Sequence, residues 1–315
     1  MSDRQRWTLD QAAEWSERLS DMRGCNYLPR TCVNPTQLWQ DPAAHPIDQE
    51  FAWAAEIGLN SLRVFMSYAV YVEDPGAYVY RMERFLEACA NHQLSVLFVL
   101  FDDCWGPEPL PGPQPAPIPG VHNSRWTACP GKSLKAEQHW PELAHYVRDL
   151  VYYFSRDQRI IGWDLFNEAQ PASRPLVEAA FRWAREAAPM QLLTACWQAD
   201  DLSDIISFHC YLDTDTPEFS RESEQALSHG RPALCTECLA RTQNNHLAAI
   251  VPHYTEHGIG WYVWGLVSGA SQTRFPWGWP QGGPEPCRWF HDLLYPDGTP
   301  YDSDEIALIR TAAGR

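Results

Sequence analysis

Short apolar runs alternate with longer amphipathic stretches along the whole chain. Eight of these runs are rich in Val, Ile, Leu, Phe and Trp, and they cover residues 22–28, 61–66, 95–101, 160–166, 191–197, 204–211, 232–237 and 259–266. Runs that stay apolar at successive positions are typical of parallel strands buried on both faces. The pattern therefore predicts eight short parallel strands.

Stretches with helical spacing of apolar residues lie between most of the predicted strands. They cover residues 48–57, 76–92, 141–154, 176–188, 217–229, 247–257 and 285–294. Three of them end next to a glycine, as helix C-termini often do; these are Gly58, Gly230 and Gly258. Among the inner links, the one at 198–203 is too short for a full helix.

This alternation over 315 residues predicts the α/β class, as a single (β/α)8 TIM barrel with long βα loops that occupies residues 1–315. A doubly wound open sheet is the alternative. The chain contains neither G-x-G-x-x-G nor G-x-x-x-x-G-K-[ST], so a nucleotide site does not support that alternative.

The longest irregular segment, 102–139, carries seven prolines between residues 107 and 119. It follows a predicted strand and precedes a predicted helix, and βα loops of a barrel open on the catalytic face. We predict an active-site loop; a linker between two domains is the alternative.

Two glutamates, Glu168 and Glu237, each follow an apolar run at the ends of the fourth and seventh predicted strands. These strands lie across a barrel mouth from each other, and two carboxylates that face one cleft are what glycoside hydrolysis requires. The alternative is that either glutamate is a structural charge paired with Arg63 or Arg241.

The motifs at the ends of the predicted strands resemble those of a known family. The pattern is similar to the retaining β-glycosidases of clan A, most closely glycoside hydrolase family 5 and its cellulase-like relatives. The matching pieces span nearly the whole chain, and they are Leu62-Arg63-Val64, Trp163-Asp164-Leu165-Phe166-Asn167-Glu168, His209-Cys210-Tyr211, Thr236-Glu237 and Trp264. Ala169-Gln170 after the first glutamate and Cys238 after the second depart from the usual pattern and leave the subfamily and substrate open.

The resemblance implies a double displacement on β-linked gluco-, xylo- or manno-configured sugars. Glu237 would be the nucleophile and Glu168 the acid/base, with their carboxyl groups about 5–5.5 Å apart. Donors around Glu237 would keep its pKa low, while apolar rings would raise the pKa of Glu168. A transglycosylase with the same site and an inactive carbohydrate-binding barrel remain as alternatives.

Further residues at strand ends and on the same loops are candidates for substrate binding. The resemblance implies that Asn167 binds the sugar 2-OH, that Arg63 and Tyr211 hold Glu237, and that Trp264 lies under the sugar. The full set is Arg63, Asp102, Asp103, Trp105, His122, Asn123, Trp126, Asn167, Trp197, His209, Tyr211, Trp264 and Trp277. Segments 102–139 and 275–279 would close one end of the cleft, which favours short oligosaccharides and exo action.

Composition narrows the class of partner. The 24 basic and 40 acidic residues give a net charge of −16, which argues against nucleic acid and anionic membranes, and no apolar run is long enough to span a bilayer. Fifteen Trp in so acidic a chain suggest a surface that stacks on sugar rings, so we expect a carbohydrate substrate. The oligomeric state stays open.

The N-terminal segment shows no apolar signal, so we expect a cytoplasmic protein with reduced cysteines. A disulfide between Cys104 and Cys129 stays open. Cys235 and Cys238 form a C-x-x-C, but a zinc ribbon needs a second pair, and a redox motif lies at a helix N-terminus. We therefore predict no metal and no cofactor.

Overall fold

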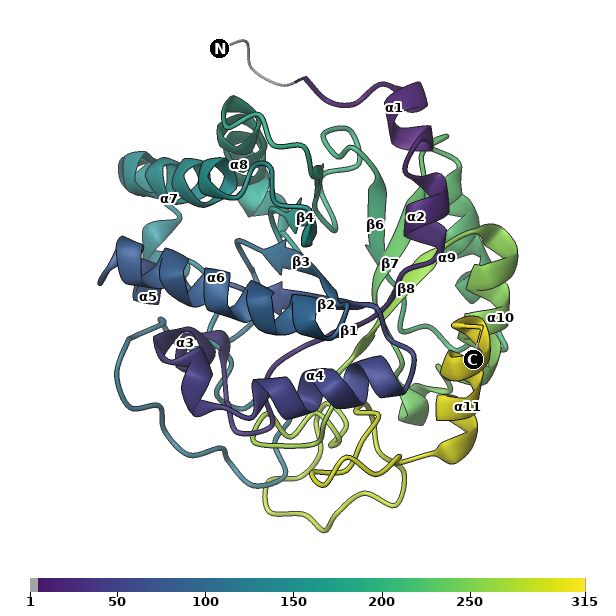
Figure 1. Cartoon of the computed structure of the whole chain (residues 1–315). Helices are drawn as coiled ribbons and strands as arrows, with labels where there is room; N and C mark the ends of the chain where they lie inside the picture. The colour runs from purple at the N-terminus through teal and green to yellow at the C-terminus, as the bar shows by residue number, and fades with distance from the viewer. Residues whose placement is uncertain (1–4, 315) are drawn as a thin grey trace.

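The computed structural model describes residues 5–314, and within that range eight parallel strands form one sheet that curves into a barrel (Figure 1). The predicted (β/α)8 barrel is confirmed; seven of the predicted apolar runs contain one strand each, and the run at 232–237 covers all of β7 except its last residue. These are β1 (Arg23–Asn26), β2 (Ser61–Phe65), β3 (Ser95–Val99), β4 (Ile160–Asp164), β5 (Leu192–Thr194), β6 (Ile206–His209), β7 (Ala233–Cys238) and β8 (Gly260–Trp264).

The barrel closes between β5 and β6. The hydrogen-bonded strand order is β5-β4-β3-β2-β1-β8-β7-β6, so these two strands are its ends. Thr194 Oγ1 donates to Ser207 Oγ over 2.9 Å, and the backbone N–H of Asp204 donates to the carbonyl of Leu193 over 2.8 Å. The short link predicted at 198–203 therefore joins neighbouring strands without a helix.

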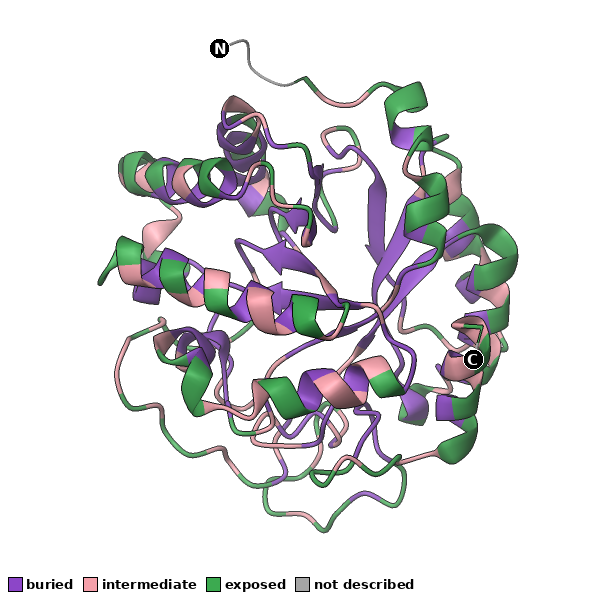
Figure 2. Cartoon of the chain, in the orientation of Figure 1, coloured by how far each residue is buried: buried purple, intermediate pink, exposed green. Residues whose placement is uncertain are grey.

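Helices surround the sheet, with buried inner faces and exposed outer faces (Figure 2). Six of the predicted helices are present, as α4 (Ile47–Glu56), α6 (Pro75–Asn91), α7 (Trp140–Tyr153), α8 (Arg174–Glu186), α9 (Pro217–Leu227) and α10 (Leu247–His257). Those that the pattern did not predict are α1 (Leu9–Ala13), α2 (Ser16–Ser20), α3 (Pro35–Gln40), α5 (Tyr68–Tyr71) and α11 (Ser303–Ala312).

The helix predicted at 285–294 was wrong. The segment lies beside the residues that follow β8, where the backbone N–H of Phe290 donates to the carbonyl of Arg274 and Leu294 forms a parallel bridge with Val267. These contacts use the backbone groups that a helix would need. The helix after β8 is instead α11, whose first turn is capped by the side chain of Asp302.

Side chains, and not open space, fill the N-terminal half of the barrel. One buried cluster there consists of Leu19, Met22, Leu97, Ile161, Leu192, Ile205, Leu234 and Tyr262. A Cβ on Gly24 would lie 2.2 Å from Tyr262, so β1 needs a glycine where this ring crosses it. Chemistry is therefore confined to the opposite end, where the strands have their carboxyl ends.

Two long loops meet at that opposite end. The 102–139 loop contains only the short helices η2 (Lys132–Leu134) and η3 (Glu137–His139). It is bound to the loop after β8 by several hydrogen bonds, including Gly120 N to Gln272 Oε1 at 3.0 Å and Asn123 N to Ser271 O at 2.8 Å. The two loops together form a continuous wall over part of the barrel mouth.

Three smaller expectations can be compared with the structure. Across residues 5–314, no helix is long and apolar enough to cross a membrane. Residues 1–4, on which the interpretation of the N-terminal segment partly depends, lie outside the described residues. All ten cysteines are free, so the disulfide left open between Cys104 and Cys129 is not formed, and Cys235 and Cys238 are not paired either.

Candidate active site

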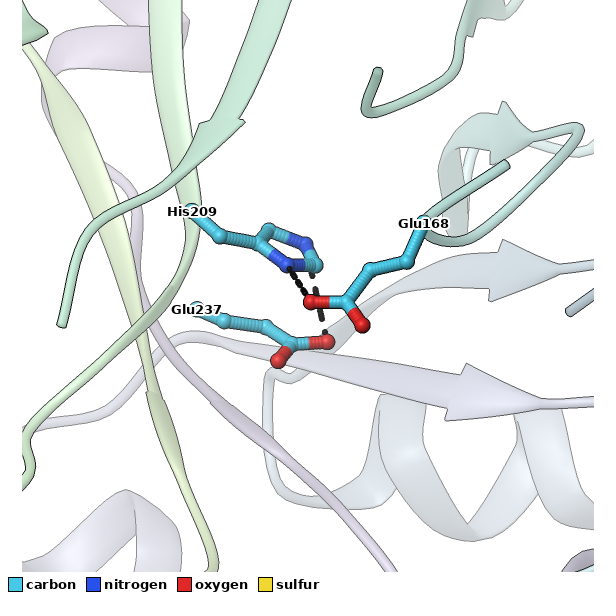
Figure 3. Close-up of side chains that lie close together, drawn as sticks. All are labelled: Glu168, His209 and Glu237. Carbon is cyan, nitrogen blue, oxygen red and sulfur yellow. Dashed lines mark hydrogen bonds and ion pairs between the residues drawn. The ribbon is translucent and has the colours of Figure 1, made fainter. Parts of the chain in front are cut away.

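Glu168 and Glu237 approach each other at the carboxyl ends of β4 and β7 (Figure 3). One oxygen of each carboxyl group and one ring nitrogen of His209 all lie within 4.8 Å of one another. Glu237 is 5% exposed, whereas the side chain of Glu168 is 22% exposed. Glu168 has a φ of +46°, a strained backbone conformation for a residue other than glycine.

His209, at the end of β6, lies beside the two carboxyl groups and faces both of them (Figure 3). Its Nδ1 is 2.8 Å from Oε1 of Glu168, and its Nε2 is 3.5 Å from Oε1 of Glu237. Burial lowers the pKa of His209 to about 4, because the interior disfavours the imidazolium. The imidazole is therefore neutral near pH 7 and has a single N–H for two carboxyl neighbours.

Arg63 on β2 organises the side of the site that Glu237 occupies. Its guanidinium donates from Nη1 to Glu237 over 2.7 Å and to Asn26 over 2.7 Å. It donates from Nε and Nη2 to Asp164, at 3.0 and 2.8 Å, and from Nη2 to Asn167 over 2.6 Å. Because Arg63 and Asp164 are fully buried, this network fixes the carboxylate of Glu237 rigidly.

Burial raises the pKa of both glutamates above the ordinary value. For Glu237 it outweighs the lowering by His209 and Arg63, so the low pKa expected from its donors was wrong. For Glu168 it outweighs a hydrogen bond from Cys104 and the charge of Arg63. Tyr211 donates its hydroxyl to Oε2 of Glu237 over 2.9 Å, and burial followed by the charge of Glu237 raises the pKa of that phenol.

Asp102 and Asp103 make contacts within the protein. Asp102 is 2% exposed and accepts from Trp126 Nε1 over 2.7 Å and from Asn167 Nδ2 over 3.0 Å. Asp103 forms an ion pair with Lys135 and accepts from the backbone N–H of Gln170 over 2.9 Å. Both carboxylates therefore hold the walls of the site.

The cavity above the two glutamates has a volume of about 360 Å³, at the small end of the usual range for ligand sites. It is lined by Cys104, Trp105, His122, Asn123, Trp126, Glu168, Trp197, His209, Tyr211, Glu237, Trp264, Trp277 and His291. Eleven of these were candidates from the sequence. The other four candidates do not line the cavity, and they are Arg63, Asp102, Asp103 and Asn167.

Four residues of the site were not assigned a role from the sequence. Asn26 and Asp164 bind Arg63, Cys104 contacts Glu168, and His291 lines the cavity. A polar residue at the end of an apolar run was a usable signal for the first two. Cys104 and His291 lie in irregular segments, where spacing does not indicate which way a side chain points.

Among the described residues, Glu168, His209 and Glu237 form the group whose donor atoms could hold a metal ion. Arg63 donates to Oε1 of Glu237, so one of the oxygens that a cation would use already faces a guanidinium. Two carboxyl groups with raised pKa values and a neutral imidazole fit acid–base chemistry without such an ion.

Comparison with known proteins supports this fold assignment. No protein-family model matches the chain, and no curated protein matches it. Among solved structures, it is similar to an exo-β-1,4-mannosidase from Opitutaceae bacterium strain TAV5, with a TM-score of 0.64 and 17% identity over 93% of this chain. This chain covers 59% of the length of that mannosidase.

Two further structures give the same result. A GH5_18 protein from Bifidobacterium longum subsp. longum, in complex with Manβ1-4GlcNAc, has a TM-score of 0.62 and 12% identity over 93% of this chain and 78% of its own. A glycoside hydrolase family 5 mannosidase from Rhizomucor miehei has a TM-score of 0.57 and 15% identity over 93% and 92%. The likeness shows that this chain has the barrel fold found in family 5 glycoside hydrolases of clan A.

Proposed function

We propose that this protein is a retaining β-glycosidase that removes one sugar at a time from the non-reducing end of short oligosaccharides. The observation that carries the proposal is the approach of one carboxyl oxygen of Glu168 to one of Glu237 within 4.8 Å, in a cavity that both residues line. Retaining glycosidases hold their two carboxyl groups about 5–5.5 Å apart, and inverting ones about 6.5–9.5 Å apart. The close approach of these oxygens favours the retaining arrangement.

The assignment of roles follows from the partners of each carboxyl group. Glu237 accepts from Arg63 and Tyr211, which hold a carboxylate in place for attack on the anomeric carbon. Glu168 is more exposed and has no cationic partner in direct contact, so it would protonate the leaving oxygen and then activate water. Asn167, held by Asp102 and Arg63, would bind the sugar 2-OH.

Exo action is supported by the wall over the barrel mouth. His122 from the 102–139 loop bonds to the carbonyl of Phe275 in the loop after β8, and both loops contribute cavity residues beside Trp264. A sugar stacked on Trp264 would therefore meet the wall at its non-reducing end. The leaving group would point toward Glu168 and the half-exposed Trp197.

The substrate panel that tests this proposal consists of aryl β-mannosides, β-glucosides and β-xylosides. The similar structures from three organisms bear the names of mannosidases or were solved with a mannosyl sugar, so β-mannosides come first in the panel. Proton NMR of the first-formed product distinguishes the mechanisms, because retention releases the β-anomer. Initial release of the α-anomer would contradict the proposal.

Variants of the two glutamates complete the test. Glu237→Gln should abolish turnover, and Glu168→Gln should lower kcat about 10²- to 10⁴-fold with poor leaving groups. Glu256→Gln on the exposed face of α10 is the matched control and should behave as wild type. Unchanged turnover in both site variants would rule out this site. Product analysis with added acceptor sugars separates hydrolysis from transglycosylation.

A further inference from the structure

Cys104 is the one cysteine of the chain that lines the cavity with Glu168 and Glu237. Eight of the other nine are buried away from this cavity, and Cys287 is exposed elsewhere on the surface. The Sγ atom of Cys104 lies 3.4 Å from Oε2 of Glu168, within hydrogen-bond range for sulfur. A thiol thus contacts the proposed acid/base directly.

The direction of this hydrogen bond follows from the other contacts of the sulfur. Asn167 donates from Nδ2 to Cys104 Sγ over 3.3 Å, so the sulfur acts as an acceptor toward the amide. A thiol carries one hydrogen, and that hydrogen is then available for Glu168. Burial raises the pKa of Cys104 far above its ordinary value, with the charges of Asp102 and Glu168 acting the same way, so the hydrogen stays on sulfur.

Asp102 is the carboxylate that competes for the thiol hydrogen. Its Oδ1 already accepts from the backbone N–H of Cys104 over 2.9 Å and from Asn167 over 3.0 Å, and its Oδ2 accepts from Trp126 over 2.7 Å. In contrast, Oε2 of Glu168 has Cys104 as its hydrogen-bond donor, while His209 is on Oε1. The thiol therefore donates its hydrogen to Glu168 and not to Asp102.

We propose that Cys104 is a positioning residue for Glu168, whose thiol donates to Oε2, fixes the rotation of the carboxyl group and stabilises its ionised form. The role rests on the proposed function of Glu168 as the acid/base. It adds a donor from the loop after β3 to the glutamates and His209, which come from the ends of strands. In the glycosylation step the thiol transfers no proton, and it only orients the group that does.

The charged and titratable groups around Glu168 come from four elements, and they are Arg63 on β2, Asp102 and Cys104 after β3, His209 and Tyr211 at β6, and Glu237 on β7. Of these, Cys104 and His209 make direct hydrogen bonds to Glu168. Removing the thiol leaves Oε2 without a donor. The pKa of Glu168 should then rise, because the ionised form loses more than the neutral form does.

The test is the pH dependence of kcat/KM in Cys104→Ala and Cys104→Ser, with Cys287→Ser as the matched control. With a phenyl β-glycoside, which needs acid assistance, the basic limb of Cys104→Ala should move up by about 0.5–1 pH unit. Cys104→Ser keeps a donor and should restore the limb, and Cys287→Ser should match wild type. With a dinitrophenyl β-glycoside, which leaves without acid assistance, the variants should show no such difference.

A fall in kcat/KM that is equal at every pH, or equal for both leaving groups, would overturn the proposal in favour of simple packing. A second measurement does not depend on turnover. The infrared S–H stretching band of Cys104 is identified from the spectrum of wild type minus that of Cys104→Ser. This band should move to higher frequency in Glu168→Ala. A band that does not respond would also overturn the role of Cys104, whereas a wild-type protein inactive on every glycoside would contradict the proposed function alone.

Discussion

Trp126 donates its indole N–H to Oδ2 of Asp102 over 2.7 Å, and both side chains are at least 96% buried. This bond joins the middle of the 102–139 loop to its first residue. The other oxygen of Asp102 accepts from Asn167, the residue before Glu168. One carboxylate thus connects an aromatic wall of the cavity to the strand that carries the proposed acid/base.

Asp102→Asn should therefore impair catalysis more than binding. An asparagine has one acceptor oxygen, so it cannot accept from both Trp126 and Asn167 and would set its own N–H₂ against one of them. We expect kcat/KM to fall about 10- to 100-fold, corresponding to the loss of one or two charge-assisted hydrogen bonds. Steady-state kinetics with an aryl β-glycoside measure this fall.

Asp103→Asn is the control for Asp102→Asn. The carboxylate of Asp103 bonds to Lys135 and to the backbone N–H of Gln170, whereas Asn167 and Trp126 donate to Asp102. Its replacement should lower the melting temperature by a few degrees and leave kcat/KM within about threefold. Equal losses in the two variants would contradict the role given to Asp102.

The pH dependence of activity should follow the two raised pKa values. Glu237 must be ionised to attack, and Glu168 must be protonated to assist departure of the leaving group. Because burial raises the pKa of each, both limbs of the kcat/KM profile should lie above the ordinary glutamate value of about 4.3. An acid limb below pH 4 would contradict the raised pKa of Glu237.

The sequence predicted the barrel well because its strands are buried on both faces. A run that is apolar at successive positions, such as 95–101, fits a strand in the interior of a layered fold. The helix predicted at 285–294 failed because the apolar positions Trp289, Phe290, Leu293 and Leu294 pack inward from an extended segment. Helical spacing over ten residues does not distinguish these two arrangements, and only the contacts with β8 decide between them.

The sequence likewise predicted one part of the candidate site and not the other. Glu168, His209 and Glu237 end strands of a closed barrel, so topology alone brings them to one place. Asp102 and Asp103 also follow a strand, but their side chains turn into the loop because Trp126 and Lys135 provide partners there. Such partners come from residues more than 20 positions away, and no local pattern indicates them.

The burial of Asp292 predicts that the stability of the fold depends on pH. It is 1% exposed, Thr273 donates to its Oδ1 over 2.7 Å, its Oδ2 has no partner, and burial raises its pKa to about 6. A folded-state pKa above the unfolded value of about 3.9 means that its contribution to stability is present below pH 4 and is lost as the pH rises through 6. The loss is about 3 kcal/mol for a shift of two units.

Asp292→Asn removes this titration. The free energy of unfolding of wild type minus that of the variant should fall by about 3 kcal/mol between pH 4 and pH 6 and then stay level to pH 8. Urea unfolding at each pH measures both values. Asp297→Asn is a matched control, since Asp297 is exposed on the same loop, and it should show no such fall. A difference that grows with pH would contradict the sign.

Trp197 and Trp277 should separate the leaving-group side of the cavity from the glycone side. Trp197 follows β5, lies with its ring 6.2 Å from that of His209 and is 45% exposed. Trp277 belongs to the loop after β8, with its ring 5.2 Å from Tyr211 and 6.1 Å from His122. Stacking of a sugar on an indole contributes about 1–2 kcal/mol, so each truncation should cost about 5- to 30-fold where a sugar is stacked.

Glycosyl fluorides make this comparison direct, because their leaving group has no sugar ring. Trp197→Ala should lower kcat/KM for a β-linked disaccharide and leave hydrolysis of the corresponding glycosyl fluoride within about twofold. Trp277→Ala should slow both substrates, because the glycone is common to them. If Trp197→Ala slows the fluoride as much as the disaccharide, the ring instead contacts the glycone, and the leaving group does not exit beside Glu168.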